Sequence, residues 1–163
     1  LRGTTVGARD NGSGLLAALV AAEAAPAAGV GVLITGAEEF GLVGARVFAR
    51  EYGPQLVGVE VVNLDTLDDQ GTLYVVSHDA PGARLAGGVA AALGGVAPVV
   101  RERGQPLWAY VDSHPLARTG AAALTVARLD WGTLRLMHTP RDTPAGLEFR
   151  TAEAVGRLVA TPI

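Results

Sequence analysis

Apolar and polar positions divide the chain into blocks whose spacing predicts strands and helices in alternation. A short unbroken apolar run, typical of a strand buried on both faces, lies at 30–34, and further strands are predicted at the largely apolar segments 57–64, 72–77, 98–102 and 121–128. Between them, apolar residues recur at helical spacing and predict helices at about 10–25, 41–52, 81–93, 114–119 and 148–159. This alternation predicts an α/β fold, a three-layer sandwich with a mostly parallel (mixed) sheet.

The helical spacing also predicts which side chains face the sheet. Gly12 and Gly14 would allow the first helix to begin close to a strand. Between the helices and strands, polar loops are expected at 1–9, 104–112 and 129–144. The predicted inward residues are Leu15, Leu16, Leu19 and Val20 in the first helix, Leu42, Val43, Val47 and Phe48 in the second, and Phe149, Val155, Leu158 and Val159 in the last.

The length and composition of the chain exclude several classes of protein. A length of 163 residues suits a single domain, 1–163. The mean hydropathy is +0.31, but no apolar run approaches the ~20 residues that span a bilayer, so we expect a soluble protein without a membrane partner. A net charge of -3 without a basic cluster gives no reason to expect nucleic-acid binding. The absence of Cys excludes disulfides, thiolate metal ligands and a Cys nucleophile.

Metal-ligand side chains follow several of the predicted strands. Glu38 and Glu39 follow the run at 30–34, where neighbouring residues point in different directions, so one carboxylate could bind a metal while the other faces a water. Asp65 ends the next strand, Asp10 precedes a helix, and His138 lies in a loop after a later strand. The carboxyl ends of strands in an α/β sheet form the crevice used for chemistry. Carboxylates with imidazole suit zinc, manganese or cobalt.

Each of these residues also has a purely structural interpretation. The two glutamates could form a solvated acidic turn, and Asp10 could be only a helix cap. Asp65 could be a surface turn residue, and His138 a loop histidine satisfied by hydrogen bonds. The residues alone therefore leave a metal site and a set of ordinary polar turns both open.

Four sequence motifs, in order, resemble those of the dizinc aminopeptidase family (peptidase family M-28), which includes aminopeptidase Y and the bacterial leucyl aminopeptidases. The run GARDNGSG at 7–14 resembles its GAxDNxSG motif, and EEFGLVGA at 38–45 resembles its EExGLxGS motif. NLD at 63–65 resembles its NxD strand end, and MHTPRDT at 137–143 resembles its xHTxxDT motif. The resemblance implies a phosphorylase/hydrolase-like zinc peptidase fold.

The resemblance also implies a role for each matching residue. Asp10 would bridge two divalent metals, which the resemblance implies are zinc, and Asp65 would bind one of them. Glu39 and His138 would bind the other. Glu38 would be the general base that generates a bridging hydroxide, which attacks the first peptide bond of a peptide substrate. Thr139 and Asp142 would order the loop around His138.

Two departures from the family pattern stand out. The family has a further His ligand, in an HxD motif about a dozen residues before the position of Asp10, which would fall just before residue 1. The chain has neither an initiator Met nor a targeting segment. We therefore expect a chain truncated at its N-terminus that lacks the first strands of the fold. Family members are often secreted, but no compartment follows from this sequence.

The second departure concerns the group that would hold the transition state. Residues 111–116 (VDSHPL) resemble the family's SDHxPF segment, with Asp112 aligned but His114 one position late. Tyr110 and His114 both remain candidates for that contact. The alternatives to an aminopeptidase are a carboxypeptidase, a glutaminyl-cyclase-like enzyme, or an inactive peptidase-like binding domain. Oligomeric state and the preferred N-terminal residue stay open.

Overall fold

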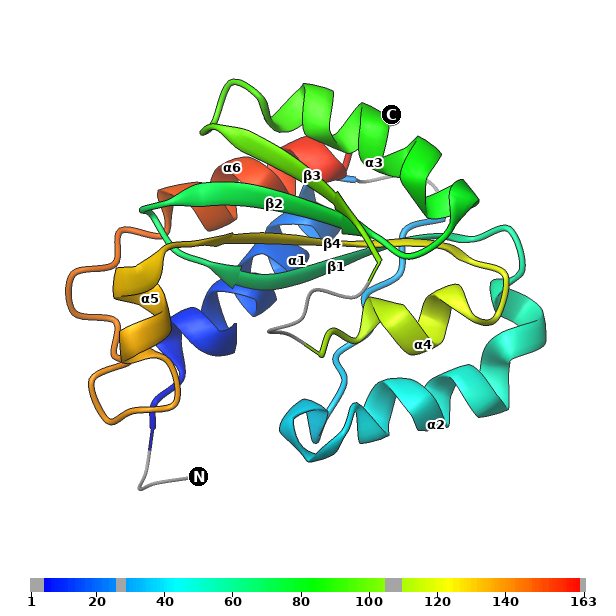
Figure 1. Ribbon diagram of the computed structural model, residues 1–163, viewed down its shortest axis with the longest axis horizontal. Helices are drawn as coiled ribbons and strands as arrows, with labels where there is room; N and C mark the ends of the chain where they lie inside the picture. The colour runs from blue at the N-terminus through cyan, green and yellow to red at the C-terminus, as the bar shows by residue number, and fades with distance from the viewer. Residues whose placement is uncertain (1–4, 26–28, 105–109, 162–163) are drawn as a thin grey trace.

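The computed structural model describes residues 5–25, 29–104 and 110–161. In this part of the chain, four strands form one sheet in the order β1-β4-β2-β3 (Figure 1). The strands are β1 (Glu60–Leu67), β2 (Thr72–Ser77), β3 (Val99–Arg103) and β4 (Ala122–Leu129). β1 pairs with β4 and β2 with β3 in parallel, whereas β2 and β4 are antiparallel. The predicted α/β class with a mixed, mostly parallel sheet is confirmed.

Helices cover both faces of this sheet. They are α1 (Gly14–Ala24), α2 (Val43–Tyr52), α3 (Ala80–Leu93), α4 (Ser113–Ala117), α5 (Trp131–Leu136) and α6 (Arg150–Val159). A kinked π-type turn occupies Ala8–Ser13, and tighter 3₁₀ turns occupy Glu38–Phe40 and Gly53–Leu56. In Figure 1, α3 and α6 lie on one side of the sheet and α2 and α4 on the other. The arrangement is the predicted three-layer sandwich.

The hydrophobic core lies between the central strands and helices α3 and α6. Leu73 and Val75 of β2 and Leu124 and Val126 of β4 are completely buried. Burial of one such side chain stabilises the fold by about 1.5–3 kcal/mol. Val155 of α6 is also buried, and Phe149, Leu158 and Val159 pack partly against the core, as the spacing in this helix predicts.

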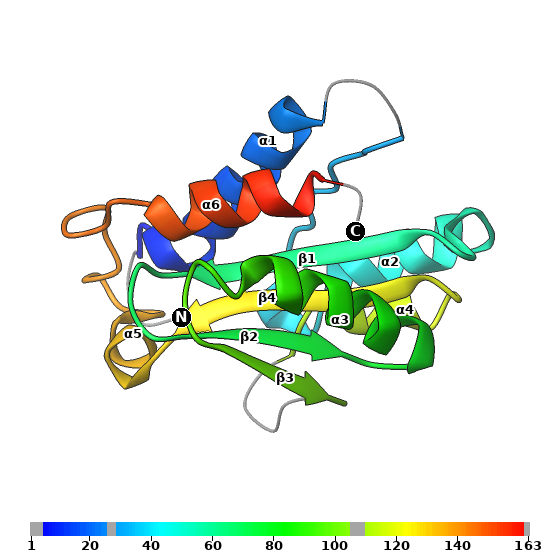
Figure 2. The same ribbon diagram turned by 90° about the horizontal axis from the view of Figure 1, so that it is seen from above.

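Small residues, and not the predicted leucine stripe, form the buried face of α1. Ala17 and Ala21 are buried, whereas Leu15 and Leu19 are 40% and 52% exposed, so the predicted stripe is wrong at these two positions. Helix α6 crosses α1 at close range (Figure 2). A Cβ on Gly156 of α6 would lie 2.5 Å from the backbone oxygen of Ala17. The close crossing favours the Ala face and turns the larger side chains outward.

The apolar run at 30–34 is not a strand, contrary to its prediction. Val30 and Ile34 are 52% and 66% exposed, and the ladders of the described residues involve only β1 to β4. An apolar run becomes a strand only where a neighbour pairs with its backbone, and no described segment does so here. On α2, Val43 and Val47 are likewise exposed, because Leu42 and Ala45 take the inward positions.

Helix α5 lies in a segment for which only a loop was predicted. The Asp130 side chain accepts a hydrogen bond from the backbone N–H of Thr133, and the Thr133 hydroxyl reaches back to the N–H of Asp130. This reciprocal arrangement is a capping box, which stabilises the N-terminus of this short helix. The helix ends directly before Met137 and His138 and thereby sets where the histidine loop begins.

Candidate metal centre

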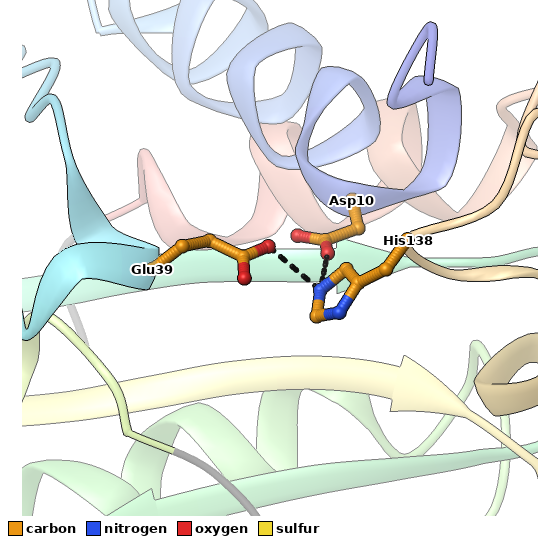
Figure 3. A group of neighbouring side chains, drawn as sticks. All are labelled: Asp10, Glu39 and His138. Carbon is orange, nitrogen blue, oxygen red and sulfur yellow. Dashed lines mark ion pairs between the residues drawn. The ribbon is translucent and has the colours of Figure 1, made fainter. Parts of the chain in front are cut away.

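Asp10, Glu39 and His138 bring three potential ligand atoms together (Figure 3). The His138 Nε2 atom lies 2.7 Å from Glu39 Oε1 and 2.8 Å from Asp10 Oδ2. Within the described ranges this is the only group of three or more His, Cys, Asp or Glu side chains with such spacing. Three of the four predicted metal ligands therefore converge on one point.

The three residues come from separate turns that meet beside the sheet. Asp10 lies in the turn Ala8–Ser13 before α1, Glu39 lies in the turn Glu38–Phe40 before α2, and His138 follows α5. His138 (φ 58°) and Ala37 (φ 56°) both adopt the left-handed backbone conformation. This conformation costs roughly 1–3 kcal/mol at a non-Gly residue, and residues that adopt it cluster at functional sites.

An irregularity in β1 presents Asp65, the fourth predicted ligand. The register with β4 shifts between Leu64 and Leu67, and Thr66 has a positive φ of 52°. Such bulges redirect a side chain out of the regular ladder. Burial, followed by the nearby Asp10 carboxylate, raises the pKa of Asp65 to about 7. Asp65 thus lies close enough to Asp10 for the two negative charges to repel each other.

A cavity of about 370 Å³ contains these side chains and Glu38. Its polar side is formed by Asp10, Glu38, Glu39, Asp65 and His138, and its apolar side includes Val76, Val111, Leu129, Leu134 and Met137. Burial, and then the charges of Asp65 and Asp112, raise the pKa of Glu38 to about 7. Burial also raises the pKa of Asp10, although the His138 imidazole opposes this shift. Crowded carboxylates with raised pKa values favour a cation.

The remaining predicted residues of the histidine loop make backbone contacts. Thr139 Oγ1 donates to the backbone oxygen of Leu136 at 2.6 Å, and the N–H of Asp142 donates to the backbone oxygen of Thr139 at 3.1 Å. The fully buried carboxylate of Asp142 accepts hydrogen bonds from the backbone N–H groups of Arg9 and Asp10. The histidine loop and the Asp10 turn are therefore joined directly.

The segment 110–114, which runs into α4, contributes two of its three predicted residues to the site. Tyr110 lines the cavity and is 65% exposed. Asp112 accepts a hydrogen bond from Thr35 Oγ1, and its charge contributes to the raised pKa of Glu38. His114 does not line the cavity and instead packs edge-on against His78, with ring centroids 5.3 Å apart.

The donor set fits one divalent cation without rearrangement of the fold. In a tetrahedral zinc site, ligand atoms bonded at ~2.0–2.2 Å lie roughly 3.4 Å apart, so the three atoms would need to separate only slightly. Asp65 lies in the same cavity as Asp10, outside this three-ligand group. No third ligand of this kind joins Asp65 within 5–25, 29–104 and 110–161.

Sequence reasoning assigned no site role to Arg9, Asn11 or Ser13. Arg9 is buried, and its Nε donates to Asp68 Oδ2 at 2.8 Å. Asn11 bonds to the backbone of Leu64 and Thr66, and Ser13 Oγ accepts from the N–H of Leu67 at 2.8 Å. All three residues belong to the GARDNGSG run at 7–14. Their place in this motif is the sequence feature that could have indicated a role near the site. The contacts of Asn11 and Ser13 fasten the Asp10 turn to β1, and Arg9 joins it to Asp68, which directly follows β1.

Known proteins with similar folds are zinc aminopeptidases and their relatives. The Legionella pneumophila LapA aminopeptidase matches with a TM-score of 0.76 at 21% identity, over 98% of this chain and 46% of its own. BSAP, a zinc aminopeptidase from Bacillus subtilis, matches with a TM-score of 0.74 at 22% identity, over 96% and 41%. An aminopeptidase from Aneurinibacillus sp. strain AM-1 matches with a TM-score of 0.63 at 23% identity, over 95% and 39%. No curated protein matches the sequence.

This chain therefore spans less than half the length of these solved relatives. Among the residues that the structure describes, no helix is long and apolar enough to cross a membrane. The model of Peptidase family M28 matches residues 2–163, which is nearly the whole sequence. The chain belongs to peptidase family M28.

Proposed function

We propose that this chain is a metal-dependent exopeptidase that removes N-terminal residues from peptides. The observation that carries the proposal is the convergence of Asp10, Glu39 and His138 in one cavity beside Glu38. The relatives named as zinc aminopeptidases support zinc as the metal and a peptide as the substrate. The M28 match supports hydrolysis of a peptide bond.

The residues would divide the work of holding the cations. Asp10, Glu39 and His138 would bind one cation, and Asp65 together with Asp10 would help to hold a second. Bound divalent cations supply Lewis-acid polarisation of a carbonyl and make a water molecule more acidic. Asp142 would hold the Asp10 turn, and Thr139 would order the histidine loop.

Glu38 would move the proton. It lines the cavity but does not belong to the three-ligand group, so its carboxylate is free to accept a proton from the attacking water. The same carboxylate would then deliver that proton to the nitrogen of the leaving amine. Tyr110 lines the cavity and would contact the bound peptide. The apolar wall near Leu134 and Met137 would accept an apolar side chain of the substrate.

A hydrolysis assay with leucyl-4-nitroanilide tests this proposal. We expect Glu38→Gln to retain its metal and to lose turnover by roughly 10²–10⁴-fold, since it removes one general base. Glu51→Gln is the matched control, because Glu51 is exposed on α2, where it pairs with Arg50. Turnover of Glu38→Gln at the rate of the parent would contradict the mechanism.

The same assay separates the aminopeptidase from its alternatives. An aminopeptidase needs a free α-amino group, so the N-acetylated substrate should remain intact. Equal hydrolysis of both substrates, or release of residues only from peptide C-termini, would contradict the aminopeptidase assignment. Metal binding without any hydrolysis would favour a peptidase-like binding domain.

A further inference from the structure

Asp142 forms a buried bridge between two loops that carry metal-ligand residues. Its side chain is fully buried. Oδ1 accepts a hydrogen bond from the backbone N–H of Arg9 at 2.8 Å, and Oδ2 accepts one from the backbone N–H of Asp10 at 3.1 Å. The backbone oxygen of Asp142 also accepts from the N–H of Ala8 at 3.4 Å. One residue therefore holds three successive amides of the turn that contains Asp10.

The same residue is fixed to the histidine loop from the other side. The N–H of Asp142 donates to the backbone oxygen of Thr139, the residue next to His138. Asp142 therefore holds the Asp10 turn through its carboxylate and the histidine loop through its backbone N–H, although Asp10 and His138 are far apart in the sequence. The relative position of Asp10 Oδ2 and His138 Nε2, now 2.8 Å apart, depends on this connection.

Arg9 keeps the buried negative charge of Asp142 compensated. Arg9 Nη1 lies 3.7 Å from Asp142 Oδ1, and the same guanidinium donates from Nε to Asp68 at 2.8 Å. A buried carboxylate is retained at this depth only when it is paired and hydrogen-bonded, as it is here. The contacts to two backbone amides need both carboxylate oxygens, and an amide side chain offers only one acceptor.

We propose that Asp142 is a positioning residue that sets the affinity and geometry of the cation site by orienting Asp10 relative to His138. The proposal rests on the cation site argued above, since Asp142 itself offers no ligand atom to that site. Outer partners that orient metal ligands typically change metal affinity by about 10–100-fold when they are replaced.

Asp69 provides a matched control for the substitution. Its carboxylate likewise accepts backbone N–H groups, from Glu148 at 2.7 Å, Phe149 at 3.0 Å and Thr151 at 3.0 Å. These amides lie at the start of α6 and not in any segment that carries a metal-ligand residue. Asp142→Asn and Asp69→Asn therefore remove the same kind of contact, the first at the cation site and the second away from it.

The test is titration of the metal-free parent and both variants with Co²⁺, with the visible Co²⁺ absorption as the readout of coordination geometry. We expect Asp142→Asn to fold, to bind Co²⁺ about 10–100-fold more weakly and to show an altered absorption spectrum. Asp69→Asn should keep the affinity and spectrum of the parent. Parent-like binding by Asp142→Asn, or an equal loss in Asp69→Asn, would overturn the proposal.

Two further outcomes are distinguishable from these. A parent that binds no Co²⁺ would overturn the cation site and, with it, the role of Asp142. Should Asp142→Asn not fold, hydrogen exchange in the metal-free parent decides: the amides of Arg9 and Asp10 should be protected by their bonds to Asp142. Exchange of both amides at the rate of an unstructured peptide would overturn the proposal.

Discussion

The side chain of Asn11 takes the place of a strand partner at Thr66. The backbone N–H of Thr66 donates to Asn11 Oδ1 at 3.1 Å, and Asn11 Nδ2 donates to the backbone oxygen of Leu64 at 3.0 Å. These are the backbone groups that flank Asp65 where β1 departs from its register with β4. Asn11 thus satisfies the irregular strand and holds the Asp10 turn beside Asp65.

Replacement of Asn11 should therefore weaken the fold as well as the site. We expect Asn11→Ala to lower the free energy of unfolding by about 1–3 kcal/mol, because the side chain makes three hydrogen bonds to backbone groups, including one from the N–H of Gly14. Urea denaturation of the metal-free proteins measures this change. A variant as stable as the parent would show that water satisfies these groups equally well.

Gly14 is required by the close approach of α1 to β1. A Cβ at this position would overlap the backbone oxygen of Leu64 and Asn11 Oδ1. We expect Gly14→Ala to destabilise the protein by about 1–3 kcal/mol or more, since backbone would have to move. Gly95→Ala is the control, because nothing lies within 4 Å of its added Cβ. Equal thermal stability of the two variants would contradict this interpretation.

Arg9 and Arg50 both pair with carboxylates but should differ in their effect on stability. Arg9 is buried between Asp68 and Asp142, so Arg9→Met leaves two buried charges without a cation and should cost about 3–5 kcal/mol. The Arg50–Glu51 pair is exposed, and Arg50→Met should change the free energy of unfolding by less than about 1 kcal/mol. Urea denaturation compares the two, and similar losses would argue against the buried network.

Asp69 should make stability depend on pH in a defined direction. Burial alone would raise the pKa of Asp69, but the backbone N–H groups of Thr151, Glu148 and Phe149 lower it below the ordinary 3.8. A lowered carboxyl pKa contributes stability above the ordinary value, and this contribution is lost as the pH falls below it. The difference in unfolding free energy between the parent and Asp69→Asn should therefore shrink from pH 7 toward pH 3. A constant difference across this range would contradict the assignment.

Much of the fold could be predicted because its strands are short, largely β-branched segments separated by turns and helices. The strand at 72–77 is predicted to the residue, and the core face of α6 follows its helical spacing. The run at 30–34 has an apolar pattern that also predicts a strand. No described strand pairs with it, so the local pattern alone does not produce a strand here. The prediction for the buried face of α1 is wrong because this face depends on a neighbouring helix. The close crossing of α6 favours small residues over leucines there.

Residue types predicted the candidate ligands better than the groups that hold them in place. Asp10, Glu39 and His138 carry ligand chemistry and lie in recognisable motifs. Arg9 acts through carboxylates, and Asn11 through backbone groups, of segments that are distant in the sequence. Such long-range contacts produce no periodic pattern in a sequence. Only the three-dimensional structure reveals that these residues fasten the Asp10 turn.

Cation binding by the parent and by His138→Ala tests the central claim most directly. His78→Ala serves as the control, because His78 lies outside the cavity and packs against His114. We expect the parent and the control to bind Zn²⁺ in titration calorimetry. His138→Ala should bind it more weakly by at least about 100-fold, which is the upper end of the loss for an outer partner. Zn²⁺ binding by His138→Ala that equals the parent, or no binding by the parent, would contradict the account.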